Sequence, residues 1–124
     1  MTWGGIRRDK HDIKFSLLVR SRAKGRCEKC LKVKPLECSH FHGRRKKSVR
    51  WSLENCSALC HGCHRDFTEN PARHAAWMIK KIGIDRYNLL LLQANTPCFM
   101  LKGDYEVLNM WLDQELGKEK ERNL

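Results

Sequence analysis

This 124-residue chain contains two Cys-x-x-Cys pairs, whose spacing is typical of a metal-binding site. Cys27 and Cys30 make the first pair, and Cys60 and Cys63 make the second, with 29 residues between the pairs. Each pair can present two thiolates from one tight turn, and two pairs complete the tetrahedral four-sulfur set that structural Zn²⁺ prefers. The sequence therefore predicts a structural zinc site that clips together two segments of the chain.

Redox or disulfide chemistry is the alternative use of these cysteines. A thioredoxin-like redox site needs one Cys-x-x-Cys pair in a βαβ setting, and the pattern here offers no such setting. Seven cysteines in a chain expected in a reducing compartment also favour metal binding over disulfides. Cys38 and Cys56 lie near the predicted zinc site without a Cys-x-x-Cys partner, and Cys98 is interpreted as a small buried hydrophobic residue.

Three further polar residues, His40, Asn55 and His64, lie between or beside the cysteine pairs. Hydrolysis of a phosphodiester needs an activated water and neutralisation of charge on the leaving oxygen. A neutral imidazole can deprotonate the water, and a divalent cation can stabilise the oxyanion. A side-chain amide can hold the imidazole in its productive orientation. These residues are therefore candidate catalytic groups, and the alternative is that each is a structural or solvated side chain.

The charge of the chain is strongly one-sided. Lys and Arg number 25 against 14 Asp and Glu, a net charge of +11. Residues 1–50 carry 16 basic and four acidic residues, whereas residues 51–124 carry nine basic and ten acidic residues. Such an excess indicates a polyanionic partner, and nucleic acid fits better than a membrane surface because no basic amphipathic helix is evident. The N-terminus has no apolar signal-peptide segment, so a cytoplasmic location is expected.

The pattern of apolar residues along the chain predicts the helices and strands that position these residues, and together they form a small α+β fold. A basic helix over about residues 10–24 ends at Gly25. Alternating apolar residues predict strands over 36–41 and 49–53, separated by a basic loop. A short helix that ends near Glu69 then completes a ββα order.

Three more helices are predicted after this unit. Asn70 and Pro71 fit the cap and first turn of a helix that ends at Gly83. Asp85 and Asp104 can each cap a further amphipathic helix. We therefore expect one domain over residues 1–124, with a zinc core at about 27–70 and a helical part at about 71–124.

Residues 27–70 resemble the HNH (ββα-metal) endonuclease signature in its zinc-binding variant. Besides the cysteine pairs, the resemblance is carried by Glu37-Cys38-Ser39-His40-Phe41, Arg50-Trp51-x-x-Glu54-Asn55 and Ala58-Leu59-Cys60-x-x-Cys63-His64. This combination is closest to phage recombination nucleases of the NinG-like type. The resemblance implies a ββα-metal core with a four-cysteine zinc knuckle, and metal-dependent cleavage of DNA.

By this resemblance, His40 would be the general base, Asn55 would orient its imidazole, and His64 would bind a catalytic Mg²⁺ or Mn²⁺. Many members of the family carry Asp or His immediately before the base, where this chain has Ser39, a poorer ligand. His42 is a candidate replacement because alternate residues of a strand share a face. Phosphate contacts, which position the backbone without reading sequence, would come from Arg44, Arg45, Lys46, Lys47 and Arg50.

Three functions compete for these observations. The leading hypothesis is an HNH endonuclease that acts on DNA, supported by the three candidate catalytic residues together. A non-catalytic zinc-ribbon protein that binds nucleic acid is the alternative, and Ser39 favours it. A zinc domain for protein interaction fits less well, because protein interfaces are depleted of Lys. Since one HNH site hydrolyses one strand at a time, double-strand cleavage would need a homodimer, a protein partner or two successive cuts.

Overall fold

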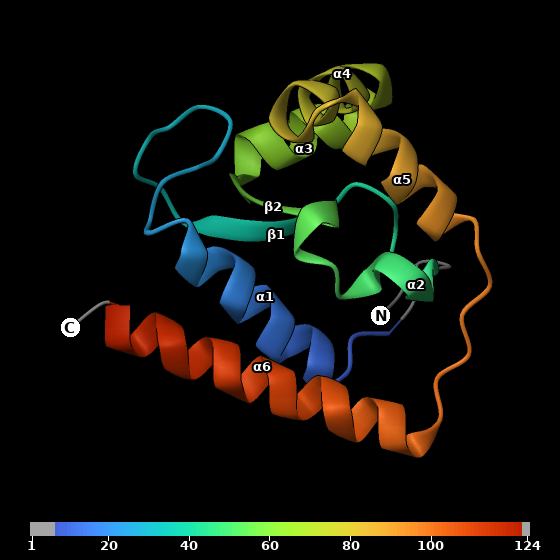
Figure 1. Ribbon diagram of the computed structural model, residues 1–124. Helices are drawn as coiled ribbons and strands as arrows, with labels where there is room; N and C mark the ends of the chain where they lie inside the picture. The colour runs from blue at the N-terminus through green and yellow to red at the C-terminus, as the bar shows by residue number, and fades with distance from the viewer. Residues whose placement is uncertain (1–6, 123–124) are drawn as a thin grey trace.

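The computed structural model describes residues 7–122 and has a small mixed α+β fold (Figure 1). Within these residues a two-stranded sheet is combined with six α-helices and one short 3₁₀ helix. The elements in chain order are α1 (Lys10–Arg22), β1 (Leu36–His40), α2 (Lys47–Arg50), η1 (Leu53–Asn55), β2 (Cys56–Cys60), α3 (His61–Glu69), α4 (Pro71–Ile82), α5 (Ile84–Ala94) and α6 (Lys102–Arg122).

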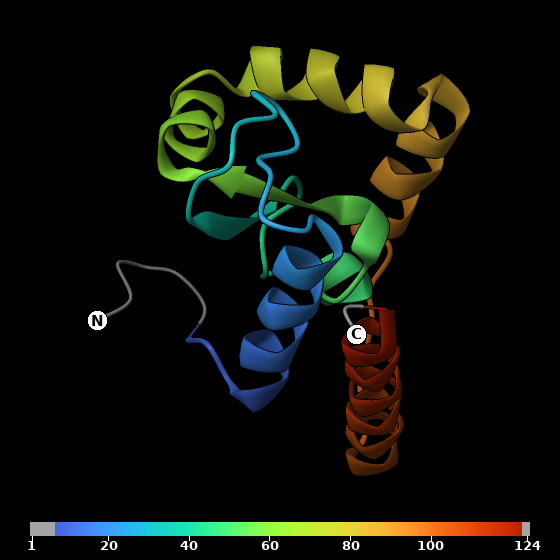
Figure 2. The ribbon, with the colours of Figure 1, turned by 90° about the vertical axis from the view of Figure 1, so that its left-hand side faces the viewer.

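The sheet lies at the centre of the molecule. β1 and β2 pair antiparallel, with Leu36 opposite Cys60 and His40 opposite Cys56. Figure 1 shows α1 and α6 on one side of the sheet and α3, α4 and α5 on the other. Figure 2 shows α4 crossing above the sheet and α5 turning down from its end. Helix α3, which follows Cys60, therefore begins beside the first residue of β1.

Helix α1 supports the sheet from below. Asp9 caps its N-terminus by accepting hydrogen bonds from the backbone N–H groups of His11 and Asp12. Phe15, Leu18 and Val19 are buried against β2 and α6. The predicted basic helix is confirmed, and the chain leaves it through Gly25, whose φ of +83° suits glycine.

The second strand predicted over residues 49–53 is wrong. Val49 lies in α2, and after η1 the strand begins at Cys56 instead. All five residues of β2 are buried. A strand buried on both faces has no polar alternation, and Cys-Ser-Ala-Leu-Cys also lacks the β-branched and aromatic residues that mark strands. The pattern that predicts strands therefore misses this one.

The three helices predicted after residue 70 are confirmed, but Asp85 and Asp104 are not the caps of the last two, because α5 and α6 begin before these residues. Asn70 precedes α4, but its side chain donates hydrogen bonds to Asp66 and makes no cap. Gly83, with φ of +88°, separates α4 from α5. No helix among the described residues has both the length and the apolar composition needed to cross a bilayer.

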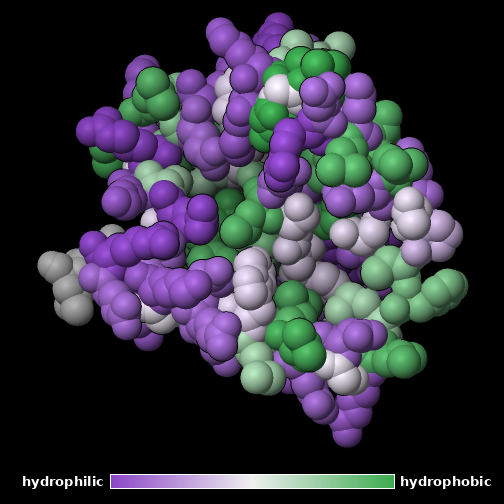
Figure 3. Space-filling model, viewed as in Figure 1, coloured by the Kyte–Doolittle hydropathy of each residue, from purple (hydrophilic) through white to green (hydrophobic). Residues whose placement is uncertain are grey.

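Surface character differs across the molecule. In Figure 3 the α1 side is mostly hydrophilic, whereas hydrophobic side chains gather on the side of α5 and the segment before α6. The exposed residues there include Leu92, Phe99 and Leu101.

Candidate functional site

The four cysteines of the two Cys-x-x-Cys pairs converge at one point. Their sulfur atoms all lie within 4.8 Å of one another, and the Sγ atoms of Cys30 and Cys60 are 3.9 Å apart. A Zn²⁺ ion with Zn–S bonds of about 2.3 Å would place sulfurs about 3.8 Å apart at the corners of a tetrahedron. The cluster could therefore hold a metal ion such as zinc.

A tight turn builds the first half of this cluster. The N–H of Leu31 donates to the carbonyl of Cys27 at 2.9 Å, and Leu31 adopts a left-handed φ of 64°. Glu28 docks the turn on β2: its N–H donates to the Ala58 carbonyl at 2.9 Å, and its carboxylate accepts the Ala58 N–H at 2.6 Å. In the second half, Cys60 ends β2 and Cys63 lies in the first turn of α3.

Burial and hydrogen bonding give the cysteines unequal acidity. Burial raises the pKa of Cys27, but N–H groups of Cys30, Cys60 and Lys29 outweigh it and lower that pKa to about 6. Burial, reinforced by the neighbouring thiols, raises the pKa of Cys63 to about 12. A cation must displace the remaining thiol protons, so its affinity for the site increases with pH.

A second feature is a pocket of about 690 Å³ between α1, β1 and α3. His40 from the end of β1 and His64 from α3 both line it, and so does Glu37. Three arginines, Arg8, Arg20 and Arg44, also line the pocket, against one further acidic residue, Asp12. The structure thus brings two of the three predicted catalytic residues into one basic hollow.

His40 has the properties of a base. A 2.9 Å contact joins its Nε2 atom to the carbonyl oxygen of Arg50, so Nε2 carries the proton and Nδ1 keeps a free lone pair. Burial lowers the pKa of His40 and outweighs the opposing effect of this carbonyl. The imidazole is therefore neutral at pH 7 and can accept a proton.

His64 is held by a carboxylate that sequence reasoning missed. Its Nδ1 lies 2.7 Å from Oε1 of Glu37, and His61 Nδ1 lies 3.1 Å from the other carboxylate oxygen. The hydrogen bond from His64 holds the pKa of Glu37 below its usual value, so the carboxylate is ionised. The sequence feature that could have drawn attention to Glu37 is that only four acidic residues occur among the first 50 residues.

Asn55 does not orient the His40 imidazole as expected. Its fully buried side chain bonds residue 42 twice, because Oδ1 accepts the His42 N–H at 2.8 Å and Nδ2 donates to the His42 carbonyl at 2.9 Å. Nδ2 also donates to the carbonyl of Val49 at 3.1 Å. Asn55 therefore fixes the loop that follows β1, and the backbone of Arg50 holds the ring of His40.

Ser39 and His42, the two weaker candidates for the catalytic cation, do not line the pocket. Ser39 is buried, and strand alternation turns it to the face opposite His40. His42 lies beyond the end of β1, so the rule of alternation no longer applies to it. Its ring instead packs edge-on against Phe41, with centroids 4.7 Å apart.

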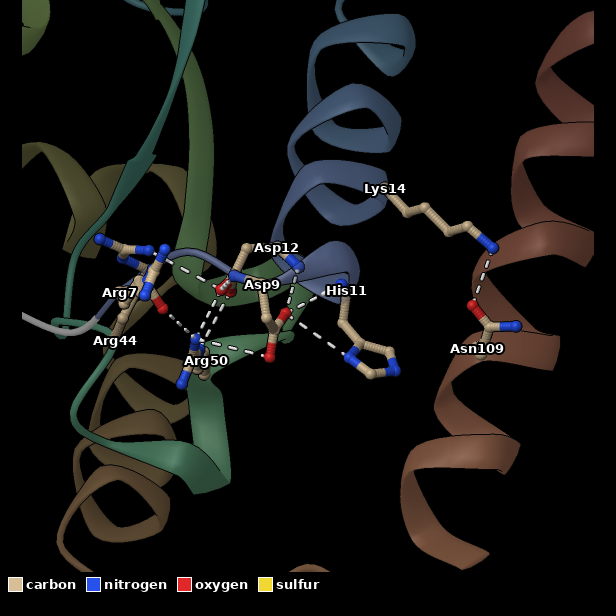
Figure 4. Close-up of polar contacts among 8 residues, drawn as sticks. All are labelled: Arg7, Asp9, His11, Asp12, Lys14, Arg44, Arg50 and Asn109. Atoms are coloured by element: carbon tan, nitrogen blue, oxygen red, sulfur yellow. Dashed lines mark hydrogen bonds and ion pairs between the residues drawn. The ribbon is translucent and has the colours of Figure 1, made fainter. Parts of the chain in front are cut away.

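The predicted phosphate-binding residues separate into two groups. Arg44 lines the His40 pocket, and all five residues line an adjacent hollow of about 330 Å³, but Arg50 differs from the others in its partner. Arg50 is only 5% exposed, and its guanidinium binds the buried carboxylate of Asp12 (Figure 4). The expectation that Arg50 grips phosphate is therefore corrected, because the residue serves to join α2 to α1.

Comparison with known proteins gives no match for this chain. No family model matches it, and no curated protein and no solved structure does so at the significance required. The resemblance of residues 27–70 to the HNH signature stays a prediction drawn from the motifs.

Proposed function

We propose that the protein is a metal-dependent endonuclease of the HNH type that hydrolyses phosphodiester bonds in DNA. The observation that carries this proposal is the shared pocket, in which a neutral His40 and a carboxylate-backed His64 lie among three arginines. The order of the elements supports it too, because β1 and β2 are followed directly by α3.

In this proposal His40 is the general base. Its free Nδ1 takes a proton from a water molecule, the water oxygen attacks the phosphorus, and the bond from phosphorus to the leaving oxygen breaks. Arg8, Arg20 and Arg44 face the non-bridging oxygens and neutralise their charge. The carbonyl of Arg50 keeps the proton on Nε2, so Nδ1 stays available as the acceptor.

His64 is the residue that would hold the catalytic cation, through Nε2, because its Nδ1 is bonded to Glu37. Mg²⁺ or Mn²⁺ would take oxygen ligands from water and the phosphate for the rest of its shell. Bound there, the cation would stabilise the negative charge that develops on the leaving oxygen. The hydrogen bond between Glu37 and His64 fixes the imidazole, as carboxylates do for metal-binding histidines.

The four-cysteine cluster has a structural role in this proposal. A Zn²⁺ ion bound there ties the turn after α1 to the first turn of α3, which carries His64. The turn after α1 is docked on β2 through Glu28, so zinc would fix His64 relative to His40.

A plasmid-nicking assay tests the proposal. Wild-type protein is incubated with supercoiled DNA in Mg²⁺, Mn²⁺ or EDTA, beside His40→Ala and a matched control, His61→Ala. His61 also contacts Glu37, but its side chain is 79% exposed and lies outside the pocket. We expect metal-dependent nicking that His40→Ala abolishes and His61→Ala retains. Equal nicking by wild type and a correctly folded His40→Ala would refute the assignment.

A non-catalytic zinc-ribbon protein that binds nucleic acid is the second candidate. The burial of Ser39 on the far face favours it, because the residue before the base then supplies no ligand. The adjacent hollow lined by Arg45, Lys46 and Lys47 would still bind phosphates. The same assay separates the two candidates, since this one predicts salt-sensitive DNA binding with no cleavage in any metal.

A further inference from the structure

A second cluster of metal-binding side chains lies beside the first strand. Cys38, His40 and Cys56 each offer one ligand atom, and these atoms lie within 4.8 Å of one another. Strand pairing explains the cluster, because His40 is directly opposite Cys56 and Cys38 shares the face of His40 two residues away. None of these residues belongs to the four-cysteine site.

The donor set selects a particular class of cation. Two sulfurs and one imidazole nitrogen suit a thiophilic ion such as Zn²⁺, whereas Mg²⁺ and Mn²⁺ prefer oxygen. Three protein ligands leave the fourth tetrahedral position open. The contact between His40 Nε2 and the Arg50 carbonyl is the kind of outer contact that orients metal-binding histidines.

A route from solvent to these ligands exists. Cys38 and His40 line the 690 Å³ pocket, while Cys56 is only 3% exposed and lies opposite His40 on the neighbouring strand. A cation that enters the pocket therefore meets two of its ligands at the pocket wall, and the third is the strand partner of His40. Binding releases the thiol protons, and one Zn²⁺ with two thiolates adds no net charge to the site.

We propose that Cys38, His40 and Cys56 form a second Zn²⁺ site whose occupation silences the protein. The silencing rests on the proposed nuclease function, because coordination takes the lone pair of His40 that would otherwise accept the proton from water. The binding itself does not depend on that function.

Metal stoichiometry tests the binding without any activity assay. Full-length protein is stripped of metal, titrated with Zn²⁺ under reducing conditions, desalted and analysed for bound zinc. We expect two ions per wild-type chain and one per chain of the Cys38→Ala/Cys56→Ala variant. Cys98→Ala is the matched control and should keep two, since Cys98 lies in the adjacent hollow. One ion per wild-type chain, or two in the double variant, would overturn the proposal.

A second variant guards against a folding defect. If circular dichroism shows that the double variant is unfolded, His40→Gln removes one ligand and leaves both cysteines in place. The second Zn²⁺ should then bind more than about tenfold more weakly, since even outer-shell changes cost that much. Unchanged affinity in a folded His40→Gln protein would contradict the assigned ligand set.

Nicking assays then test the silencing separately. In Mg²⁺ or Mn²⁺, the second equivalent of Zn²⁺ should slow wild-type nicking at least about tenfold, and a mild chelator should restore it. The double variant should nick at a rate that the second equivalent does not change. Two bound ions with undiminished nicking would refute the silencing alone. Absence of nicking at one equivalent would instead count against the proposed nuclease and leave the stoichiometry result standing.

Discussion

Asn55→Ala should destabilise the protein far more than an ordinary polar substitution. The Asn55 side chain is completely buried and makes three hydrogen bonds to backbone groups of His42 and Val49. Alanine leaves one N–H and two carbonyls without these partners. At about 1–1.5 kcal/mol for each bond, the three bonds together account for a loss of about 3–4.5 kcal/mol in the free energy of unfolding.

Urea denaturation of the zinc-loaded protein measures this loss. Asn109→Ala is a matched control, because Asn109 accepts one hydrogen bond from Lys14 at a partly exposed position (Figure 4). That change should cost less than about 1 kcal/mol. If Asn55→Ala cost no more than the control, the assigned role of Asn55 would be wrong. A stable Asn55→Ala protein that had lost cleavage would support the alternative in which Asn55 orients the imidazole of His40.

Three other predictions follow from buried or strained groups. Arg50→Met should cost about 3 kcal/mol in urea denaturation because it leaves Arg44, 3.7 Å away, as the remaining cation beside the buried Asp12 carboxylate, and Arg50→Met/Asp12→Leu should recover part of the loss. Burial lowers the pKa of His74 from 6.5 to about 4. Neutral His74 therefore contributes as much as about 3 kcal/mol to the free energy of unfolding above pH 6.5, and this contribution is lost as the pH falls towards 4. His74→Phe, which keeps the stack on Phe67, should flatten that pH dependence, and an unchanged slope would contradict the assignment. Leu31→Gly should stabilise the protein by about 1 kcal/mol in thermal unfolding because Leu31 is 65% exposed and has φ of 64°; a loss of stability would show that its side chain matters.

Much of the fold follows from local signals in the sequence. Gly25 and Gly83 mark helix ends where the backbone takes positive φ, and Pro71 marks a helix start. The spacing of the cysteines predicts their convergence, because a Cys-x-x-Cys turn presents both sulfurs to one side. The pairing of β1 with β2 places Leu36 opposite Cys60, so α3 begins beside the start of β1 and His64 reaches Glu37.

The remaining features depend on contacts between distant residues. Arg50 is 38 residues from its partner Asp12, and His64 is 27 residues from Glu37. Nothing in the neighbourhood of Arg50 distinguishes it from the basic residues just before it, yet it hydrogen-bonds the buried Asp12 carboxylate, whereas Arg44 approaches that carboxylate only to 3.7 Å. The role of Asn55 could not be predicted for the same reason. Asn is a good residue for a turn, but the three backbone partners of its side chain are set by the fold.

Chemical rescue of His40→Ala tests the central claim most directly. The alanine leaves room beside a pocket of about 690 Å³, into which free imidazole can diffuse. We predict metal-dependent nicking by the wild type, no nicking by His40→Ala, and a nicking rate in the variant that rises with added imidazole and with pH through the imidazole pKa. Nicking by His40→Ala at the wild-type rate in the absence of imidazole would contradict the assignment of His40 as the base. A wild-type protein that binds DNA but never cleaves it would contradict the proposed nuclease function itself.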